Sequence, residues 1–151
     1  MGIKIITENK KARFDFHLLE KFEAGLELMG SEVKSLRNGQ VNLKDSYISF
    51  KGDEAYLQNA HISVYLASSY NNHEPERLRK LLLHRRELDR IFGAIREKGQ
   101  TCVPTKIYFK NGKVKLEIAL AKGKQKGDKR ESIKKRDVDR TLQKARRRSK
   151  E

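Results

Sequence analysis

The sequence lacks several of the residue types on which structural and catalytic sites often depend. It has no tryptophan, one cysteine and two prolines among 151 residues. A single cysteine excludes an internal disulfide and a cysteine-based zinc site, so we expect Cys102 to be a small buried apolar residue. The four histidines show neither metal-ligand spacing nor a His-Glu-x-x-His pair, and no glycine-rich phosphate loop is present. No metal or cofactor is predicted, and enzymatic activity is not expected.

Long apolar runs are also missing. No stretch approaches the roughly 18 consecutive apolar residues of a membrane span. The first residues, MGIKIITENKK, lack the apolar core of about seven residues that a signal peptide requires. We therefore expect no membrane partner and a cytoplasmic location.

Positive charge is abundant and unevenly distributed. Lysine and arginine number 35 against 20 acidic residues, which gives a formal charge of +15 and a pI near 10.0. Residues 122–151 alone hold 14 basic and 5 acidic residues. Such a field attracts polyanions, of which nucleic acid is the first candidate and an anionic membrane the second. We predict a compact body at 1–121 and a basic tail at 122–151 that is disordered when free, because its few apolar residues cannot stabilise a helix by packing.

Strand-like alternation dominates the first half. Residues 14–28 alternate apolar and polar positions with one break at Glu20, which predicts one or two half-buried strands bent near that residue. Ser31 is a candidate cap for a short helix whose Val33 and Leu36 face the core. The segments VNLKDSYISF and EAYLQNAHISVYL read as strands joined by a hairpin at KGDE.

The second half combines a helical pattern with another hairpin. Pro75 and the following leucine and isoleucine spacing predict one or two helices over 75–98. CVPTKIYF and KVKLEIALA read as strands joined by a tight turn at Asn111–Gly112. We therefore predict a mainly β fold with α: an oligonucleotide-binding-type antiparallel β-barrel with two to three flanking helices.

Features suited to RNA accompany this fold. The segment ERLRKLLLHRRELDR interleaves arginine and lysine with leucine, which indicates either an RNA contact or an ordinary solvated helix face. Aromatic residues that could stack on unpaired bases, or fill the barrel instead, are Tyr47, Phe50, Tyr56, Tyr65, Tyr70, Tyr108 and Phe109.

Six blocks in a fixed order resemble one protein family. They read NKKARFDF, FEAGLELMGSEVKSLRNG, NLKDSYISF, NAHIS, PERLRKLLLHRREL and LAKGKQKGDKRE, and they extend over residues 9–137. In this order they resemble the SsrA-binding proteins, also called small protein B, which are the partners of transfer-messenger RNA in bacterial trans-translation.

The resemblance implies a non-enzymatic RNA-binding protein. Its body would hold the tRNA-like domain of transfer-messenger RNA, and its tail would enter the decoding centre and message channel of a stalled 70S ribosome and fold there as a helix. By similarity, Glu23, Leu82, His84 and Lys115 match body positions implicated in RNA binding, and Asp128–Arg130 matches the tail motif tied to ribosomal function. Gln125, Gly127 and Val138 depart from residues common in the family tail.

The predicted site therefore has two parts, carried by a chain that we expect to be monomeric. The predicted RNA-binding residues are Glu23, Glu32, Lys34, Arg37, Arg79, Lys80, Leu82, His84, Arg85, Lys115, Lys122 and Lys124. The predicted ribosome-contacting tail residues are Asp128, Lys129, Arg130, Lys134, Lys135 and Arg136.

Two alternatives stay open at this point. One is a constitutive ribosomal or general structured-RNA-binding protein, which would associate with translating as well as stalled ribosomes. The other is an RNA-processing enzyme, which would need a metal or acid–base cluster that the sequence does not show.

Overall fold

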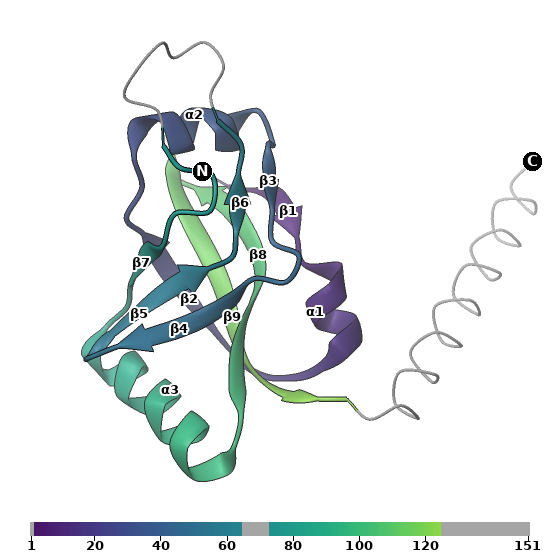
Figure 1. Cartoon of the computed structure of the whole chain (residues 1–151), viewed down its shortest axis with the longest axis vertical. Coiled ribbons are helices and arrows are strands. Elements are labelled where there is room, and N and C mark those ends of the chain that lie inside the picture. Colours follow the sequence, from purple (N-terminus) through teal and green to yellow (C-terminus); the bar gives the residue numbers. More distant parts are fainter. Residues whose placement is uncertain (1, 65–72, 125–151) are drawn as a thin grey trace, which may run out of the picture.

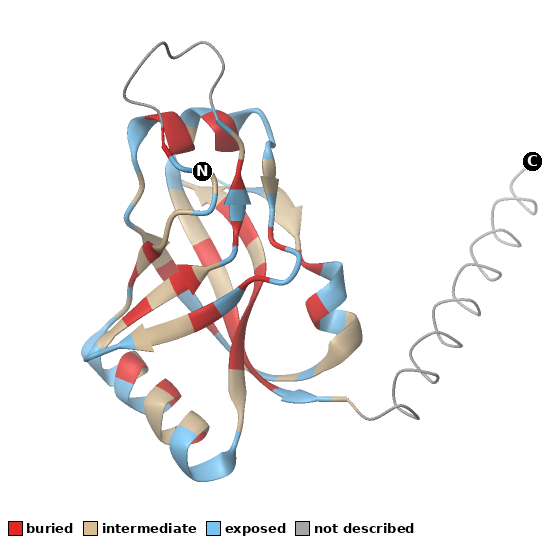
Figure 2. Ribbon diagram, viewed as in Figure 1, coloured by how far each residue is buried: buried red, intermediate tan, exposed pale blue. Residues whose placement is uncertain are grey.

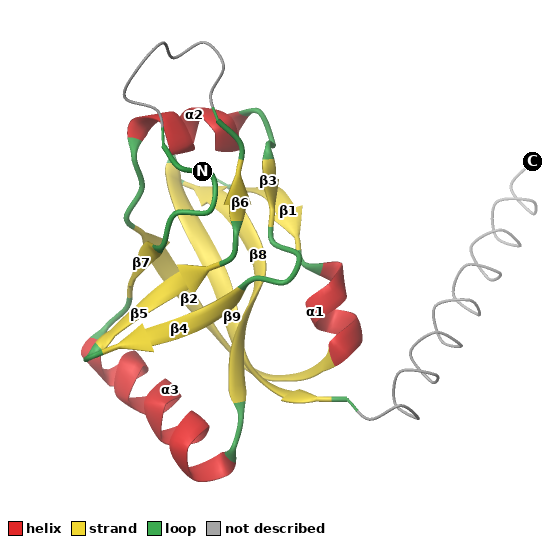
Figure 3. Ribbon diagram, viewed as in Figure 1, coloured by secondary structure: helices red, strands yellow, loops and turns green. Residues whose placement is uncertain are grey.

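Antiparallel strands make up most of the protein, and three helices flank them (Figures 1 and 3). The computed structural model describes residues 2–64 and 73–124. The strands are β1 (Ile3–Glu8), β2 (Phe16–Leu26), β3 (Val41–Asn42), β4 (Tyr47–Lys51), β5 (Glu54–Gln58), β6 (His61–Ile62), β7 (Arg79–Leu82), β8 (Thr101–Lys110) and β9 (Lys113–Gly123).

Seven of these strands form one curved sheet. Its order is β1-β8-β9-β2-β7-β5-β4, and β3 pairs separately with β6. Strand β4, at one end of this order, comes back into contact with β8 near the other end. The sheet therefore curls into a partly closed barrel, which confirms the predicted fold class.

The helices lie around this barrel. In Figure 1, α2 (Gly30–Arg37) lies at one end of the sheet, α3 (Arg85–Lys98) at the opposite end and α1 (Lys10–Asp15) to the side. Asn9 caps α1, because its side-chain oxygen accepts a hydrogen bond from the backbone N–H of Ala12 at 3.1 Å. Helix α3 ends at Gly99, whose φ of +63° is the left-handed conformation that glycine adopts without steric cost.

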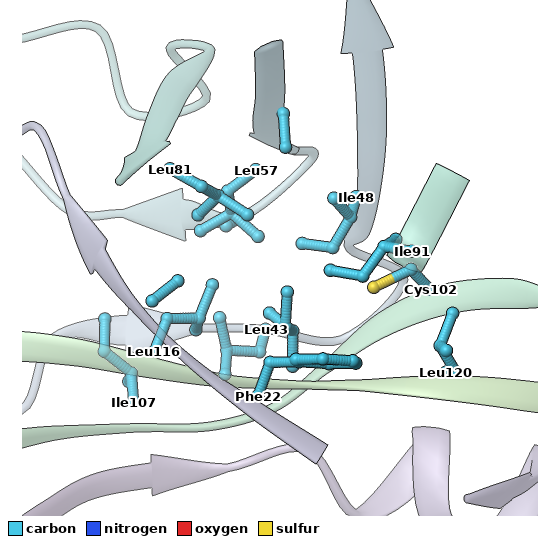
Figure 4. Packing of buried hydrophobic residues seen from close by; sticks show 14 of the residues in the cluster. Phe22, Leu43, Ile48, Leu57, Leu81, Ile91, Cys102, Ile107, Leu116 and Leu120 are labelled. Atoms are coloured by element: carbon cyan, nitrogen blue, oxygen red, sulfur yellow. The ribbon is translucent and has the colours of Figure 1, made fainter. Parts of the chain in front are cut away.

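The barrel interior holds the hydrophobic core. Aliphatic side chains from β2, β5, β7, β8, β9 and α3 meet there (Figures 2 and 4). Cys102 is buried among them, as predicted, and burial raises the pKa of its thiol to about 12. Phe50 of the β4–β5 hairpin packs on Phe92 of α3 with ring centroids 4.6 Å apart, so α3 is held against one end of the barrel.

Both predicted hairpins are confirmed. Strands β4 and β5 pair from Tyr47–Gln58 to Lys51–Glu54, and β8 and β9 pair up to Lys110–Lys113. Asn111 and Gly112 both have positive φ, of 52° and 78°, as a tight hairpin turn with right-handed strand twist requires. The predicted bend in the first long strand is also present, because the register of β2 against β9 shifts between Leu18 and Glu20.

Part of the helix predicted over 75–98 is wrong. Only Arg85–Lys98 is helical, whereas Arg79–Leu82 forms strand β7 between β2 and β5. Arg79 and Leu81 are buried while Lys80 and Leu82 point to the other face. Because leucines stand next to one another here, helical and strand spacing could not be separated, and sheet pairing decided the outcome.

Other local expectations also need correction. Phe14 belongs to α1, and β2 begins only at Phe16. Met29, not Ser31, is the N-cap of α2, since the Met29 backbone N–H donates to Glu32 at 2.8 Å. Strand β1 was not predicted, and strand β9 continues to Gly123, beyond the predicted body boundary at residue 121.

Candidate nucleic-acid interface

One face of the sheet points away from the barrel interior and carries polar side chains. In β2, Phe22 and Ala24 are buried, so the alternating Glu23 and Gly25 lie on the opposite face. Directly paired residues on antiparallel strands share a face. The register therefore places in one row across five strands the residues Leu82, Gly25, Lys115, Tyr108 and Ile5.

Neighbouring rows extend this surface. Glu23 pairs with Glu117, which pairs with Lys106, and Lys113 pairs with Lys110 at the hairpin end. The small cluster of Ala12, Val103 and Ala121 packs α1 against the far end of β8 and β9. We call the uncovered part the outer face, made of Glu23, Gly25, Leu82, Lys106, Tyr108, Lys110, Lys113, Lys115 and Glu117.

Leu82 is an exposed apolar side chain on the outer face. It is 53% exposed, and it lies so close over Gly25 that a Cβ built on Gly25 would be 3.2 Å from the Leu82 Cβ. A groove runs beside it, lined by Gly25, Leu26, Leu28, Val33, Leu82 and residues 112–115. The exposed leucine and the groove provide apolar surface beside lysine side chains, which suits the face of an unstacked base or a ribose.

Glu23 is the acidic residue of the outer face that keeps a solvent-exposed carboxylate. Its side chain is 38% exposed, and one carboxylate oxygen accepts a hydrogen bond from the Tyr108 hydroxyl at 2.6 Å. Lys110 Nζ lies 3.3 Å from the same oxygen. The hydrogen bond from Tyr108, with the nearby lysines, lowers the pKa of Glu23, so the carboxylate is ionised at neutral pH.

This combination of groups can distinguish parts of a nucleic acid. The lysines neutralise phosphates without regard to sequence. An ionised carboxylate can only accept hydrogen bonds, so it is repelled by phosphate and suits the N–H groups of bases or a ribose hydroxyl. The outer face therefore has the chemistry of a surface that attracts RNA and also selects among its exposed groups.

The structure brings together several of the predicted site residues. Glu23, Leu82 and Lys115 share the outer face, although they come from three strands and lie far apart in sequence. Lys80 points to the same side of β7 as Leu82, and its Nζ lies 3.7 Å from Glu54.

Other predicted residues lie on the surface away from the outer face. His84 is the N-cap of α3, and its backbone N–H donates to Glu87 at 3.2 Å. Arg85 follows it and lies 3.7 Å from Asp53 and 3.3 Å from Asp89. Lys34 and Arg37 are exposed on α2, and Lys122 and Lys124 lie at the end of β9 near α1. The structure thus groups a minority of the predicted set, and the roles of these residues remain predictions.

Two residues of the predicted set lie in the interior. Glu32 and Arg79 are fully buried and form an ion pair with each other. Arg77 also donates to Glu32, at 2.6 Å, and Arg79 donates to the carbonyls of Ala60 and Pro75 at 2.9 Å. Their side chains hold α2, β7 and the preceding loop together, which corrects the expectation that they contact RNA.

All the predicted tail residues from Asp128 to Arg136 lie outside the described residues. Two features of the outer face were missed from the sequence: the lysines of β8 and the contact of Tyr108 with Glu23. The Asn111–Gly112 turn fixes Tyr108 opposite Lys115, so part of this signal was present. The pairing of β2 with β9, which adds Glu23, could not be read from local sequence.

Searches for other kinds of site gave little. Within residues 2–64 and 73–124, no group of three or more histidine, cysteine, aspartate or glutamate side chains is placed to hold a metal ion. In the same ranges, no helix is long and apolar enough to cross a membrane.

Comparison with known proteins gives consistent matches over nearly the whole chain. Residues 6–148 match the model of the family described as SmpB protein. An SsrA-binding protein of Bdellovibrio bacteriovorus is 71% identical over 148 residues, covering 98% of this chain and 97% of the relative. Another from Syntrophobacter fumaroxidans is 55% identical over 145 residues, covering 96% of this chain and 90% of the relative.

A solved structure shows the same fold at substantial identity. It is described as "tmRNA-SmpB: a journey to the center of the bacterial ribosome", and its matching chain is 46% identical with a TM-score of 0.67. The match covers 84% of this chain and 93% of that one. Together with the family match over residues 6–148, these similarities establish that the chain belongs to the SmpB protein family.

Proposed function

We propose that this chain binds the tRNA-like domain of transfer-messenger RNA and delivers that RNA to stalled ribosomes for trans-translation, in which incomplete proteins are tagged. The observation that carries the proposal is the outer face, where Glu23, Leu82 and Lys115 converge from β2, β7 and β9. Membership of the SmpB family supports it, as do relatives named for SsrA binding and a structural neighbour described with tmRNA and the ribosome.

The chemistry of the outer face favours a structured RNA with exposed bases over a plain duplex. A curved sheet surface with an apolar groove fits splayed bases and ribose hydroxyls at a bend better than it fits the deep groove of an A-form helix. The basic composition supplies long-range attraction, while Glu23 and Leu82 supply groups that a purely phosphate-binding surface would not need.

The proposed division of labour follows the charge distribution. The body binds the tRNA-like domain, and the basic tail of 122–151 acts on the ribosome, in the decoding centre and message channel, through residues such as Asp128, Lys129 and Arg130. Phosphates surrounding a strongly basic segment can compensate the entropy lost when that segment is ordered. We further propose a monomeric, cytoplasmic protein that works without a cofactor and without catalysing a reaction.

The test combines binding with tagging. The full chain and a truncation after Lys124, which retains all of β9, are compared for affinity to the tRNA-like domain and for tagging on ribosomes stalled without a stop codon. The truncation is expected to keep most of the affinity and to lose tagging. Normal tagging by the truncated protein would refute the role of the tail.

A second comparison separates the proposal from general RNA binding. Affinity for the tRNA-like domain is measured against structured RNAs of equal length, over a range of salt concentrations. We expect a clear preference that persists as salt rises. Equal affinity for all of these RNAs, with equal association to translating and stalled ribosomes, would instead support a constitutive ribosomal or general RNA-binding protein.

A further inference from the structure

Tyr108 occupies an unusual position on the outer face. It belongs to a row whose other members include Lys115 and the exposed Leu82, yet it is only 4% exposed. Its hydroxyl donates to Glu23 on β2, although β9 lies between β8 and β2 in the sheet. The side chains of Tyr108 and Glu23 therefore meet across an intervening strand, and this contact joins residues 85 positions apart in sequence.

The same carboxylate has a second partner from β8. Lys110 Nζ lies 3.4 Å from one oxygen of Glu23 and 3.3 Å from the other, the one that also accepts from Tyr108. Lys106 Nζ lies 5.8 Å from the centre of the Tyr108 ring. The phenol is thus held in place beside lysines, and it directs one neutral donor at one oxygen of Glu23.

We propose that Tyr108 is a positioning residue for RNA recognition: its hydroxyl fixes the carboxylate of Glu23 so that the other oxygen faces hydrogen-bond donors of the RNA. The inference rests on the proposed function and deepens it. The groups that Glu23 would then accept from are amino and imino groups of unpaired bases or a ribose 2′-hydroxyl, and phosphates are excluded because they carry no donor.

A neutral donor suits this task better than another lysine. On a surface with Lys106, Lys110, Lys113 and Lys115, a mobile carboxylate would exchange among several ammonium groups, and RNA binding would have to pay for ordering it. The hydrogen bond from a buried phenol is directional and adds no charge that would compete for the RNA. Because Tyr108 is buried and Glu23 is 38% exposed, the RNA would contact the carboxylate and not the phenol.

The test is a double-mutant cycle on the full chain. Affinity for the tRNA-like domain is measured for the wild type, Tyr108→Phe, Glu23→Ala and the double variant. Removing a hydrogen bond to a charged group predicts a loss of affinity of about fivefold to tenfold for Tyr108→Phe. In the Glu23→Ala background the same substitution is expected to change affinity less than about twofold. Losses that multiply in the double variant would overturn the proposal.

Tyr47→Phe is the matched control. Tyr47 lies on β4, at the far end of the sheet order from β8, and its ring lines a different groove with Lys11 and Asp45. Its effect on affinity, whatever its size, should be the same with and without Glu23. Similar coupling of Tyr47 to Glu23 would show that the cycle reports a general change in structure, and it would also overturn the proposal.

A readout without RNA separates this inference from the proposed function. Titration of the Glu23 carboxyl group by NMR should show a higher pKa in Tyr108→Phe than in the wild type, and no change in Tyr47→Phe. An unchanged Glu23 pKa in Tyr108→Phe would overturn the positioning role even if the wild type prefers the tRNA-like domain. Loss of that preference in the wild type would instead overturn the proposed function.

Discussion

The guanidinium of Arg79 and the carboxylate of Glu32 form an ion pair in which neither side chain is exposed to solvent. Arg79 lies on β7, in the middle of the sheet, and Glu32 lies in the first turn of α2. Burying two charges is costly, and the remaining donors of Arg79 are satisfied by backbone carbonyls of the loop before β7. The pair therefore connects the end of the barrel covered by α2 to the sheet.

Arg79→Met should destabilise the protein by about 3–5 kcal/mol, because it leaves the charge of Glu32 buried with only Arg77 as a cationic partner. Urea unfolding measures this loss. Arg90→Met, which removes the surface pair with Glu20, should cost less than about 1 kcal/mol. The double variant Glu32→Met/Arg79→Met should be more stable than Arg79→Met alone. If Arg79→Met cost no more than Arg90→Met, the pair would have no structural role.

The ionisation of Glu32 predicts a pH dependence of stability. Burial alone would raise its pKa, but donors from Arg77, the Met29 N–H and Arg79 outweigh burial and place the pKa below its ordinary value of 4.5. A carboxyl with a lowered folded-state pKa contributes stability that is complete above the unfolded-state pKa and is lost as the pH falls through the folded-state pKa. We expect the free energy of unfolding to fall below about pH 4.5. Glu32→Gln should show a shallower fall, and an identical slope in both proteins would contradict the assignment.

Gly25→Val tests the contact between Gly25 and Leu82. A Cβ at this position would lie 3.2 Å from the Leu82 Cβ and 3.4 Å from its Cδ1, so Leu82 must move. We expect strain of about 1 kcal/mol and weaker binding of the tRNA-like domain. In a Leu82→Ala background the substitution should have little further effect on affinity. Equal losses with and without the Leu82 side chain would show that the glycine matters for another reason.

Gly93→Ala should have the opposite effect on stability. Gly93 lies inside α3, and a Cβ there would meet no atom within 4 Å. Because alanine favours the helix, we expect a gain of about 0.5–1 kcal/mol in the free energy of unfolding. Thermal or urea unfolding of the two proteins checks this, and a loss of stability would mean that the space beside Gly93 is not open.

The sequence was sufficient where the signal is local. Asn111–Gly112 fixed one hairpin, the Gly52–Asp53 region fixed another, and Glu20 marked the bend in β2. The same kind of reasoning failed at Arg79–Leu82, because the preference for a strand comes from pairing with β2 and β5 and not from residue spacing.

The candidate site was only partly predictable for the same reason. Family resemblance pointed to Glu23, Leu82 and Lys115, but their convergence depends on the order β9-β2-β7, which is a long-range property. Charge alone suggested Glu32 and Arg79 as surface residues. Their mutual neutralisation allows burial, and no local pattern separates a charge that is paired inside from one that meets a ligand.

The most direct test of the outer face as the RNA surface is NMR chemical-shift mapping of the isotope-labelled full chain during titration with the tRNA-like domain of transfer-messenger RNA. The largest changes are expected at the amides of Glu23, Gly25 and Leu82 and along 106–117, with small changes on the solvent-facing side of α3. Changes concentrated on α3, with the amides of Glu23, Leu82 and Lys115 unaffected, would contradict the proposed interface.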